Sequence, residues 1–206
     1  MKKHILTAIL YTLVTTALLG IGYPLAMTLL AHALMPYQAT GEMIRNDGVL
    51  VGSRLIGQPF TGPGYFHSRP SAAGAGYDAA NSSGSNLAPT NATLVQRVAQ
   101  SVQAIQTSRA ATGQAQMSNA PVPVDLVTTS ASGLDPDISV AAAEYQVPIV
   151  ARARGMAQEK VMSLVRQHIA PRQLGVLGEP RVNVLELNLA LDAAANAAKS
   201  SAARPR

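Results

Sequence analysis

The sequence predicts an α+β fold in which one N-terminal transmembrane helix is followed by a single mixed α/β extracytoplasmic domain. The first observation is an apolar run from Ile5 to Met35, which follows the only two full charges among the first forty residues, Lys2 and Lys3. The second is that the remaining chain alternates between short extended stretches and apolar residues at helical spacing. The expected divisions are 1–36 for the cytoplasmic N-terminus and anchor helix, 37–199 for the domain, and 200–206 for a basic, disordered tail.

The length of the apolar run favours a retained membrane anchor. A helix of about 30 residues at ~1.5 Å rise is ~45 Å long, which matches a bilayer with its headgroup regions. A secretory signal has an apolar region of only ~7–15 residues. Ala31-His32-Ala33 has the form of a signal cleavage site, so removal of the segment is the alternative.

Small and hydroxyl-bearing residues interrupt the apolar run. Pro24 leaves a backbone carbonyl without its partner, and glycines let another helix approach closely. We therefore predict that Gly20, Gly22, Thr12 and Thr16 contact a partner helix in the membrane. The alternative is an ordinary anchor that packs against lipid alone.

The orientation of the span depends on the charges at its two ends. Lys2 and Lys3 lie directly before it, while Arg45 and Arg54 follow within ~20 residues, so the positive-inside count is nearly a tie. A long domain after the span is translocated largely regardless of charge. We therefore expect the N-terminus in the cytoplasm and the domain outside.

The composition excludes several functions. The chain has no cysteine, which rules out disulfides, thiol catalysis and cysteine metal sites. Apart from the two anchor lysines it carries 14 basic and 11 acidic residues, which are interspersed. With no Trp and only two Phe there is little to stack on bases, so no nucleic-acid partner is expected.

The elements of the domain follow from periodicity and capping residues. In chain order we expect extended segments at 49–56 and 65–69, a loop at 71–91, a helix from Thr90 or Asn91 that ends before Gly113, a linker at 111–120 and an extended segment at 122–127. Ser139 is expected to cap a helix through Arg154 that Pro148 kinks or splits. A second helix is expected at 156–169. For 182–198 we favour a helix capped by Asn183, although its start also alternates like a strand.

No catalytic or metal site is expected from the motifs. The chain lacks a P-loop and an HExxH motif, and its four histidines are scattered. Asp125, Asp135 and Asp137 lie where turns and helix starts use aspartate. An alternative function is a membrane-anchored periplasmic hydrolase that uses Ser132 with Asp135 or Asp137, and a third is a stand-alone binding module.

Long, ordered stretches of the chain resemble one known family. They are GSRLIGQ at 52–58, YFHSRPS at 65–71, SGSNLAPTN at 83–91, VPVDLVT at 122–128, GLDPDIS at 133–139, GEPRVNV at 178–184 and LALD at 189–192. With the N-terminal anchor they cover almost the whole chain, and they resemble the C subunit of the Kdp high-affinity potassium-transporting ATPase.

The resemblance implies a place in a bacterial inner-membrane complex with a potassium-channel-like subunit and a P-type ATPase subunit. It implies a non-catalytic subunit that stabilises the assembly and acts as a catalytic chaperone, raising the ATP affinity of the ATPase subunit. No cofactor of its own is implied, because ATP and potassium act at the level of the complex. By the same resemblance, a nucleotide-binding role falls on Ser83, Gly84, Ser85 and Asn86.

The chain departs from the family pattern within that loop. The family usually has two adjacent glycines where this chain has Ser83-Gly84, and usually Gly where it has Ala88. A domain outside the membrane also cannot touch a cytoplasmic nucleotide. Either the orientation is reversed or the effect on ATP binding is indirect, and we favour the indirect effect.

Overall fold

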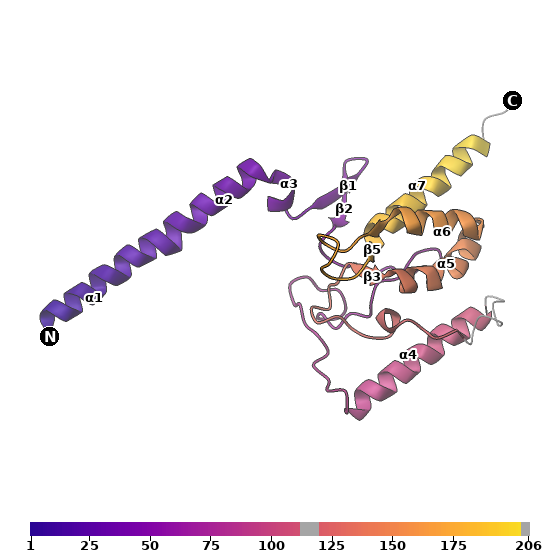
Figure 1. The fold of residues 1–206 in the computed structure, drawn as a ribbon, viewed down its shortest axis with the longest axis horizontal. Coiled ribbons are helices and arrows are strands. Elements are labelled where there is room, and N and C mark those ends of the chain that lie inside the picture. The colour runs from indigo at the N-terminus through magenta and orange to yellow at the C-terminus, as the bar shows by residue number, and fades with distance from the viewer. Residues whose placement is uncertain (112–119, 203–206) are drawn as a thin grey trace. The chain divides into compact units, whose positions relative to one another are not determined.

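The computed structural model describes residues 1–111 and 120–202 (Figure 1). The chain divides into two compact units, Met1–Ser53 and Arg54–Arg206. The long helix ends at Leu34, and the compact first unit extends through the following hairpin to Ser53, so the predicted division after residue 36 stays a prediction.

The first unit begins with one continuous helix from Lys2 to Leu34. It consists of α1 (Lys2–Thr15), a π-helical stretch (Thr16–Gly22) and α2 (Tyr23–Leu34), and a short helix α3 (Pro36–Ala39) follows. Its 33 residues are long and apolar enough to cross a membrane, and it is the one such helix among the described residues. The candidate span that the sequence predicts is therefore present.

The π-helical stretch accommodates Pro24 without breaking the helix. A proline ring inside a regular α-helix clashes with the carbonyl four residues earlier, which here belongs to Gly20. A π-helical turn widens the backbone, and here the wide turn ends at Gly22, immediately before α2. The interruption that the sequence predicts around Pro24 is thus a local widening of the helix and does not end it.

A β-hairpin completes the first unit. Strands β1 (Met43–Asn46) and β2 (Val49–Ser53) pair antiparallel through a two-residue loop. Asp47 and Gly48 in that loop have φ values of +50° and +81°, as a tight hairpin turn with the right-handed strand twist requires. The extended stretch predicted from residue 49 is present as β2, whereas its partner strand β1 was not predicted, although the Asp47-Gly48 pair is a typical hairpin signal.

The second unit contains a three-stranded antiparallel sheet and four helices longer than one turn among its described residues. The strands are β3 (Asp137–Ser139), β5 (Arg181–Asn183) and β4 (Ile169–Ala170), in the spatial order β3-β5-β4. The helices are α4 (Ala92–Ala111), α5 (Val140–Arg154), α6 (Gln158–Gln167) and α7 (Val184–Ala202). The predicted α+β fold class is confirmed.

Three helices, two strands and Phe66 contribute the buried side chains that form the hydrophobic core of the second unit. Helices α5, α6 and α7 lie together in Figure 1, and each contributes aliphatic side chains to the core. The buried residues of this core are Phe66, Ile138, Ala142, Ala143, Val147, Val150, Ala151, Val161, Val165, Val182, Val184, Leu187 and Leu191.

The predicted start and end of α5 are confirmed. The Ser139 hydroxyl accepts a hydrogen bond from Ala142 N at 3.2 Å, which is N-cap geometry. Gly155 ends the helix at a φ of +63°, and Met156 N donates to Ala151 O at 2.9 Å in a Schellman motif. Of the predicted kink or split at Pro148, the split is wrong, because the helix continues through this buried proline, and the kink stays a prediction.

The segment at 122–127 is not a strand, which corrects the sequence reading. It contains a 3-10 turn at Val124–Leu126, where Leu126 N donates to Pro123 O at 3.1 Å. Pro123 fixes its own φ at −57°, and the Thr128 hydroxyl closes the turn by donating to Val124 O at 2.8 Å. The proline and the hydrogen bonds of the turn therefore outweigh the preference of the valines for a β-strand.

The last predicted segment contains both a strand and a capped helix, the two features that its sequence suggested. Residues 181–183 form strand β5, and α7 begins at Val184. The Asn183 Oδ1 accepts a hydrogen bond from Glu186 N at 3.1 Å, so Asn183 caps the helix as predicted. Helix α7 continues to Ala202, into the first part of the predicted tail, and residues 203–206 of that tail lie outside the described residues. Residues 112–119 of the predicted linker also lie outside them.

Candidate functional site

The segment Tyr65–Arg69 is extended and alternately buried, but it belongs to no sheet among the described residues. Two buried side-chain amides take the place of neighbouring strands. Asn188 Oδ1 accepts from Phe66 N at 2.8 Å, and its Nδ2 donates to Phe66 O at 2.9 Å. Gln146 binds the next residue in the same way, accepting from His67 N at 2.8 Å and donating to His67 O at 3.2 Å. We call Gln146 and Asn188 the amide clamp.

A partly buried ion pair holds the start of the extended segment. Arg154 Nη1 lies 2.7 Å from Asp192 Oδ1, and its guanidinium lies 4.5 Å from the centre of the Tyr65 ring. The Tyr65 hydroxyl also donates to Asp192 Oδ2 at 3.3 Å. These contacts connect the C-terminal end of α5 and helix α7 to Tyr65, which directly precedes the two residues that the amide clamp binds.

Serine and arginine side chains fix the other end of the segment. Arg69 Nη2 donates to Thr129 O at 3.1 Å, and Arg69 Nη1 lies 3.3 Å from Asp135 Oδ2. The Ser71 hydroxyl donates to Gly133 O at 2.7 Å and accepts from Tyr77 N at 2.7 Å. The long loop at 71–91 therefore starts from a fixed point on the turn at 130–135.

The predicted nucleotide-binding residues lie on this loop. Ser83 N donates to Ser132 O at 2.9 Å. A Cβ on Gly84 would lie 2.8 Å from Ala131 O, and one on Gly133, where φ is +69°, would lie 2.5 Å from Ser83 O. Ser83 and Gly84 are therefore packed against the turn, and half-buried Ser85 and exposed Asn86 follow them. The nucleotide role of these four residues stays a prediction.

Ser132 and Asp135, the residues of the hydrolase alternative, form hydrogen bonds within the same turn. The Ser132 hydroxyl accepts a hydrogen bond from Leu134 N at 3.1 Å. Asp135 Oδ1 accepts from Asp137 N at 3.1 Å, while its other oxygen faces Arg69. Both side chains thus stabilise the local backbone, as aspartate and serine commonly do in turns. This arrangement gives the hydrolase alternative no support.

Asp137 lies in a partly buried polar network. Its Oδ2 is 2.9 Å from Arg181 Nε, and its Oδ1 accepts from Asn183 Nδ2 at 3.3 Å. Burial raises the pKa of the Asp137 carboxyl above its ordinary value of 3.8, although Arg181 opposes that shift. Because the folded state holds the proton more tightly, the contribution of this carboxyl to stability falls as the pH rises above 3.8. The third candidate acid, Asp125, accepts a hydrogen bond from Ser139 N at 2.8 Å and supports the start of α5.

A cavity of about 400 Å³ lies between the extended segment, α4 and α5. Its walls include Ile105, Ile149 and Val150, and its polar lining includes His67 and Tyr145. Burial lowers the pKa of His67, so its ring is neutral at physiological pH. No pattern in the sequence predicted this cavity.

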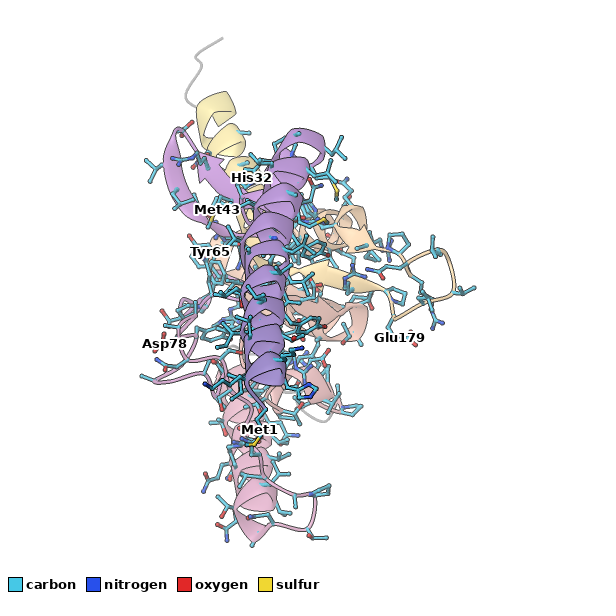
Figure 2. The ribbon with its side chains drawn as sticks, turned by 90° about the vertical axis from the view of Figure 1, so that its left-hand side faces the viewer. Met1, His32, Met43, Tyr65, Asp78 and Glu179 are labelled. Carbon is cyan, nitrogen blue, oxygen red and sulfur yellow. The ribbon has the colours of Figure 1, made fainter. Side chains whose placement is uncertain are left out.

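The predicted helix-contact residues fall on two parts of the span. Thr12, Thr16 and Gly20 succeed one another at four-residue spacing, and a Cβ on Gly20 would lie 3.7 Å from Thr16 Cγ2. Gly22 instead lines a shallow apolar groove together with Ala17 and Ala26. The apolar window of the long helix has no buried residue, and Figure 2 shows side chains along it from Met1 to His32. The predicted contacts with a partner helix stay a prediction.

The described parts of the chain contain no group of three or more acidic or histidine side chains that could hold a metal ion. The acids described above are instead bonded to arginine side chains and backbone amides. A free apolar helix of membrane-spanning length and a small α+β unit of this kind define a membrane-associated protein with a single candidate span.

Comparison with known proteins then gives the family. The family described as "K+-transporting ATPase, c chain" matches residues 5–193. Similar relatives carry the name "Potassium-transporting ATPase KdpC subunit". One from Koribacter versatilis (strain Ellin345) is 56% identical over 93% of this chain and 95% of its own length, and one from Acidobacterium capsulatum is 56% identical over 92% and 98%. A third, from Rhodopseudomonas palustris (strain BisB18), is 53% identical over 94% of this chain and 100% of its own length.

The chain belongs to this KdpC family. It is therefore a membrane-associated subunit of a potassium-transporting ATPase, as the resemblance in the sequence indicated. The motif at 65–71 that carried part of the resemblance is the segment held by the amide clamp.

Proposed function

We propose that the chain is the non-catalytic subunit that stabilises the assembled pump and raises the affinity of its ATPase subunit for ATP. Its partners are a potassium-channel-like subunit and a P-type ATPase subunit. The observation that carries the proposal is the family match over residues 5–193, in a chain whose candidate acids are engaged in turns and ion pairs.

The proposed location is the bacterial inner membrane, with the N-terminus in the cytoplasm and the second unit in the periplasm. Support comes from Lys2 and Lys3 directly before a helix of 33 residues, and from the long unit that follows it. In this orientation the loop at Ser83–Asn86 lies on the opposite side of the membrane from cytoplasmic ATP. The effect on ATP affinity is therefore indirect.

An indirect effect requires the chain to bind one conformation of the pump better than another. A subunit that bound all conformations equally would shift no equilibrium, however tightly it bound. Coupling between two sites typically changes affinity ~5–150-fold. Contacts of the span and of the second unit with the partner subunits are the means by which this chain distinguishes the conformations.

The proposal is tested by measuring ATP hydrolysis of the purified pump with and without this chain. In its absence we expect the half-saturating ATP concentration to rise by at least ~5-fold, the lower end of ordinary allosteric coupling. Adding back the purified chain should restore the original value. An unchanged ATP dependence in a stable complex that lacks the chain would contradict the proposed role.

A further inference from the structure

The loop that begins at Ser71 is attached at both of its ends to the turn at 130–135, which we call the shared turn. At the start of the loop, the Ser71 hydroxyl donates to Gly133 O at 2.7 Å. At its end, Ser83 N donates to Ser132 O at 2.9 Å. Compact surface loops whose two ends lie close together are frequently functional. The shared turn therefore fixes both ends of this loop.

The chain that enters the second unit binds the same turn. Gly57 N donates to Leu134 O at 2.8 Å. The two backbones are in direct contact, because a Cβ on Gly57 would lie 2.6 Å from Asp135 O. Asn183 Nδ2 donates to Arg54 O at 2.9 Å and ties the start of this stretch to β5. Since the stretch directly follows strand β2, the first residues of the second unit and the loop have one support in common.

The close backbone contacts leave little room for either segment to move alone. A Cβ on Gly84 would lie 2.8 Å from Ala131 O, and one on Gly133 would lie 2.5 Å from Ser83 O. These distances are shorter than real Cβ contacts, so backbone packs on backbone with no flexible side chain between. Close-packed groups transmit displacements to one another, and segments that depend on each other in this way open as one cooperative unit.

We propose that the shared turn is a coupling element, through which the chain entering the second unit and the loop from Ser71 to Gly84 open and move together. The coupling is a property of this chain alone, and only its bearing on ATP affinity rests on the proposed function. An indirect effect on a partner requires an element that passes a displacement from one part of the chain to another. The shared turn connects the residues next to the membrane hairpin with the loop to which the resemblance assigned a role.

Amide hydrogen exchange of the full-length chain in detergent tests the coupling without any substitution. Gly57 N and Ser83 N donate to different carbonyls of the shared turn, so one opening of the turn exposes both. We expect their protection factors to agree within ~3-fold and to fall with denaturant at the same slope. Asn81 N, which donates to Asp78 O inside the loop, should exchange at least ~10-fold faster, because it opens without the turn. A larger difference between Gly57 and Ser83, or unequal slopes, would overturn the inference.

Two glycine variants test the coupling by a second route. Gly57→Ala and Gly84→Ala press against different residues of the shared turn, Asp135 and Ala131. If the turn and both segments form one unit, the first change already opens that unit and leaves the second little to disrupt. We therefore expect the melting temperature of the double variant to fall by clearly less than the sum of the two single losses, as for sites that interact.

Gly57→Ala with Gly64→Ala is the control pair. A Cβ on Gly64 would meet the Arg154 side chain at 3.4 Å, so the second change lies on another contact and the losses should add. Additive losses for Gly57→Ala with Gly84→Ala as well would contradict the coupling. If Gly57→Ala prevents folding, the exchange of the wild-type amides decides. Coupled exchange in this chain, together with a pump whose ATP dependence is the same without it, would refute the proposed function and leave the coupling in place.

Discussion

Replacing Asn188 by leucine is expected to cause the largest loss of stability of any single change considered. Leucine has a similar volume but cannot hydrogen-bond, so Phe66 N and Phe66 O would lose their partners at a buried site. Each buried polar group left unpaired costs ~1–3 kcal/mol, which gives ~2–6 kcal/mol for the pair. Thermal unfolding of the full-length chain in detergent measures the effect.

Asn196→Leu is the matched control for this substitution. Asn196 lies on the same helix two turns later and is exposed, so the change should be nearly neutral. A melting temperature for Asn188→Leu equal to that of Asn196→Leu would show that the amide clamp does not hold the extended segment.

Asn188→Asp sharpens the test, because a neutral carboxyl can both accept from Phe66 N and donate to Phe66 O. At neutral pH a charged carboxylate at this buried position would face the Phe66 carbonyl, and burial would raise its pKa. The stability of this variant relative to wild type should therefore recover as the pH falls through that raised pKa. No such recovery is expected for Asn188→Leu.

The second large effect is expected in the membrane span. Gly20→Leu combined with Gly22→Leu keeps the segment apolar, so insertion should be preserved, but it fills the space through which a neighbouring helix would approach. Single threonine changes should be mild, because an interhelical hydrogen bond in a membrane contributes only ~0.6 kcal/mol on average. We expect the double leucine variant to lose most of its co-purification with the partner subunits.

Ala8→Leu with Ala33→Leu adds the same two side chains near the ends of the span and serves as the control. It should co-purify like wild type if the contact is local to Gly20 and Gly22. Wild-type yield of the glycine variant would mean that the span is only an anchor and that the second unit holds the complex together.

Local signals predicted much of the fold, because they act within a few residues. The apolar run, the caps at Ser139 and Asn183 and the glycine stop at Gly155 all appear in the structure where the sequence suggested them. The segment at 122–127 was predicted wrongly because Pro123 and Thr128 close a turn that valine content alone does not reveal. The unbroken α5 at Pro148 depends on its buried neighbours in the core, which only the tertiary structure supplies.

The site was harder to predict than the fold. Gln146 and Asn188 lie 79 and 122 residues from the backbone groups they bind, and nothing local marks a buried amide as the partner of an extended segment. The exposure of Leu174, Val176 and Leu177 could not be predicted, because aliphatic residues beside Gly175 and Gly178 also occur in ordinary turns. Ser132 and Asp135 stood out as candidate catalytic residues, yet their hydrogen bonds are those of a turn.

We propose that this chain raises the ATP affinity of the pump without itself being the nucleotide site. Calorimetric titration of MgATP into the purified full-length chain in detergent distinguishes the two possibilities, with the assembled pump as the positive control. We predict saturable binding to the assembled pump and none to the chain alone at ATP concentrations up to ~1 mM. Micromolar binding to the chain alone that Ser83→Ala with Asn86→Ala abolishes would contradict the account and make the loop at Ser83–Asn86 the nucleotide site.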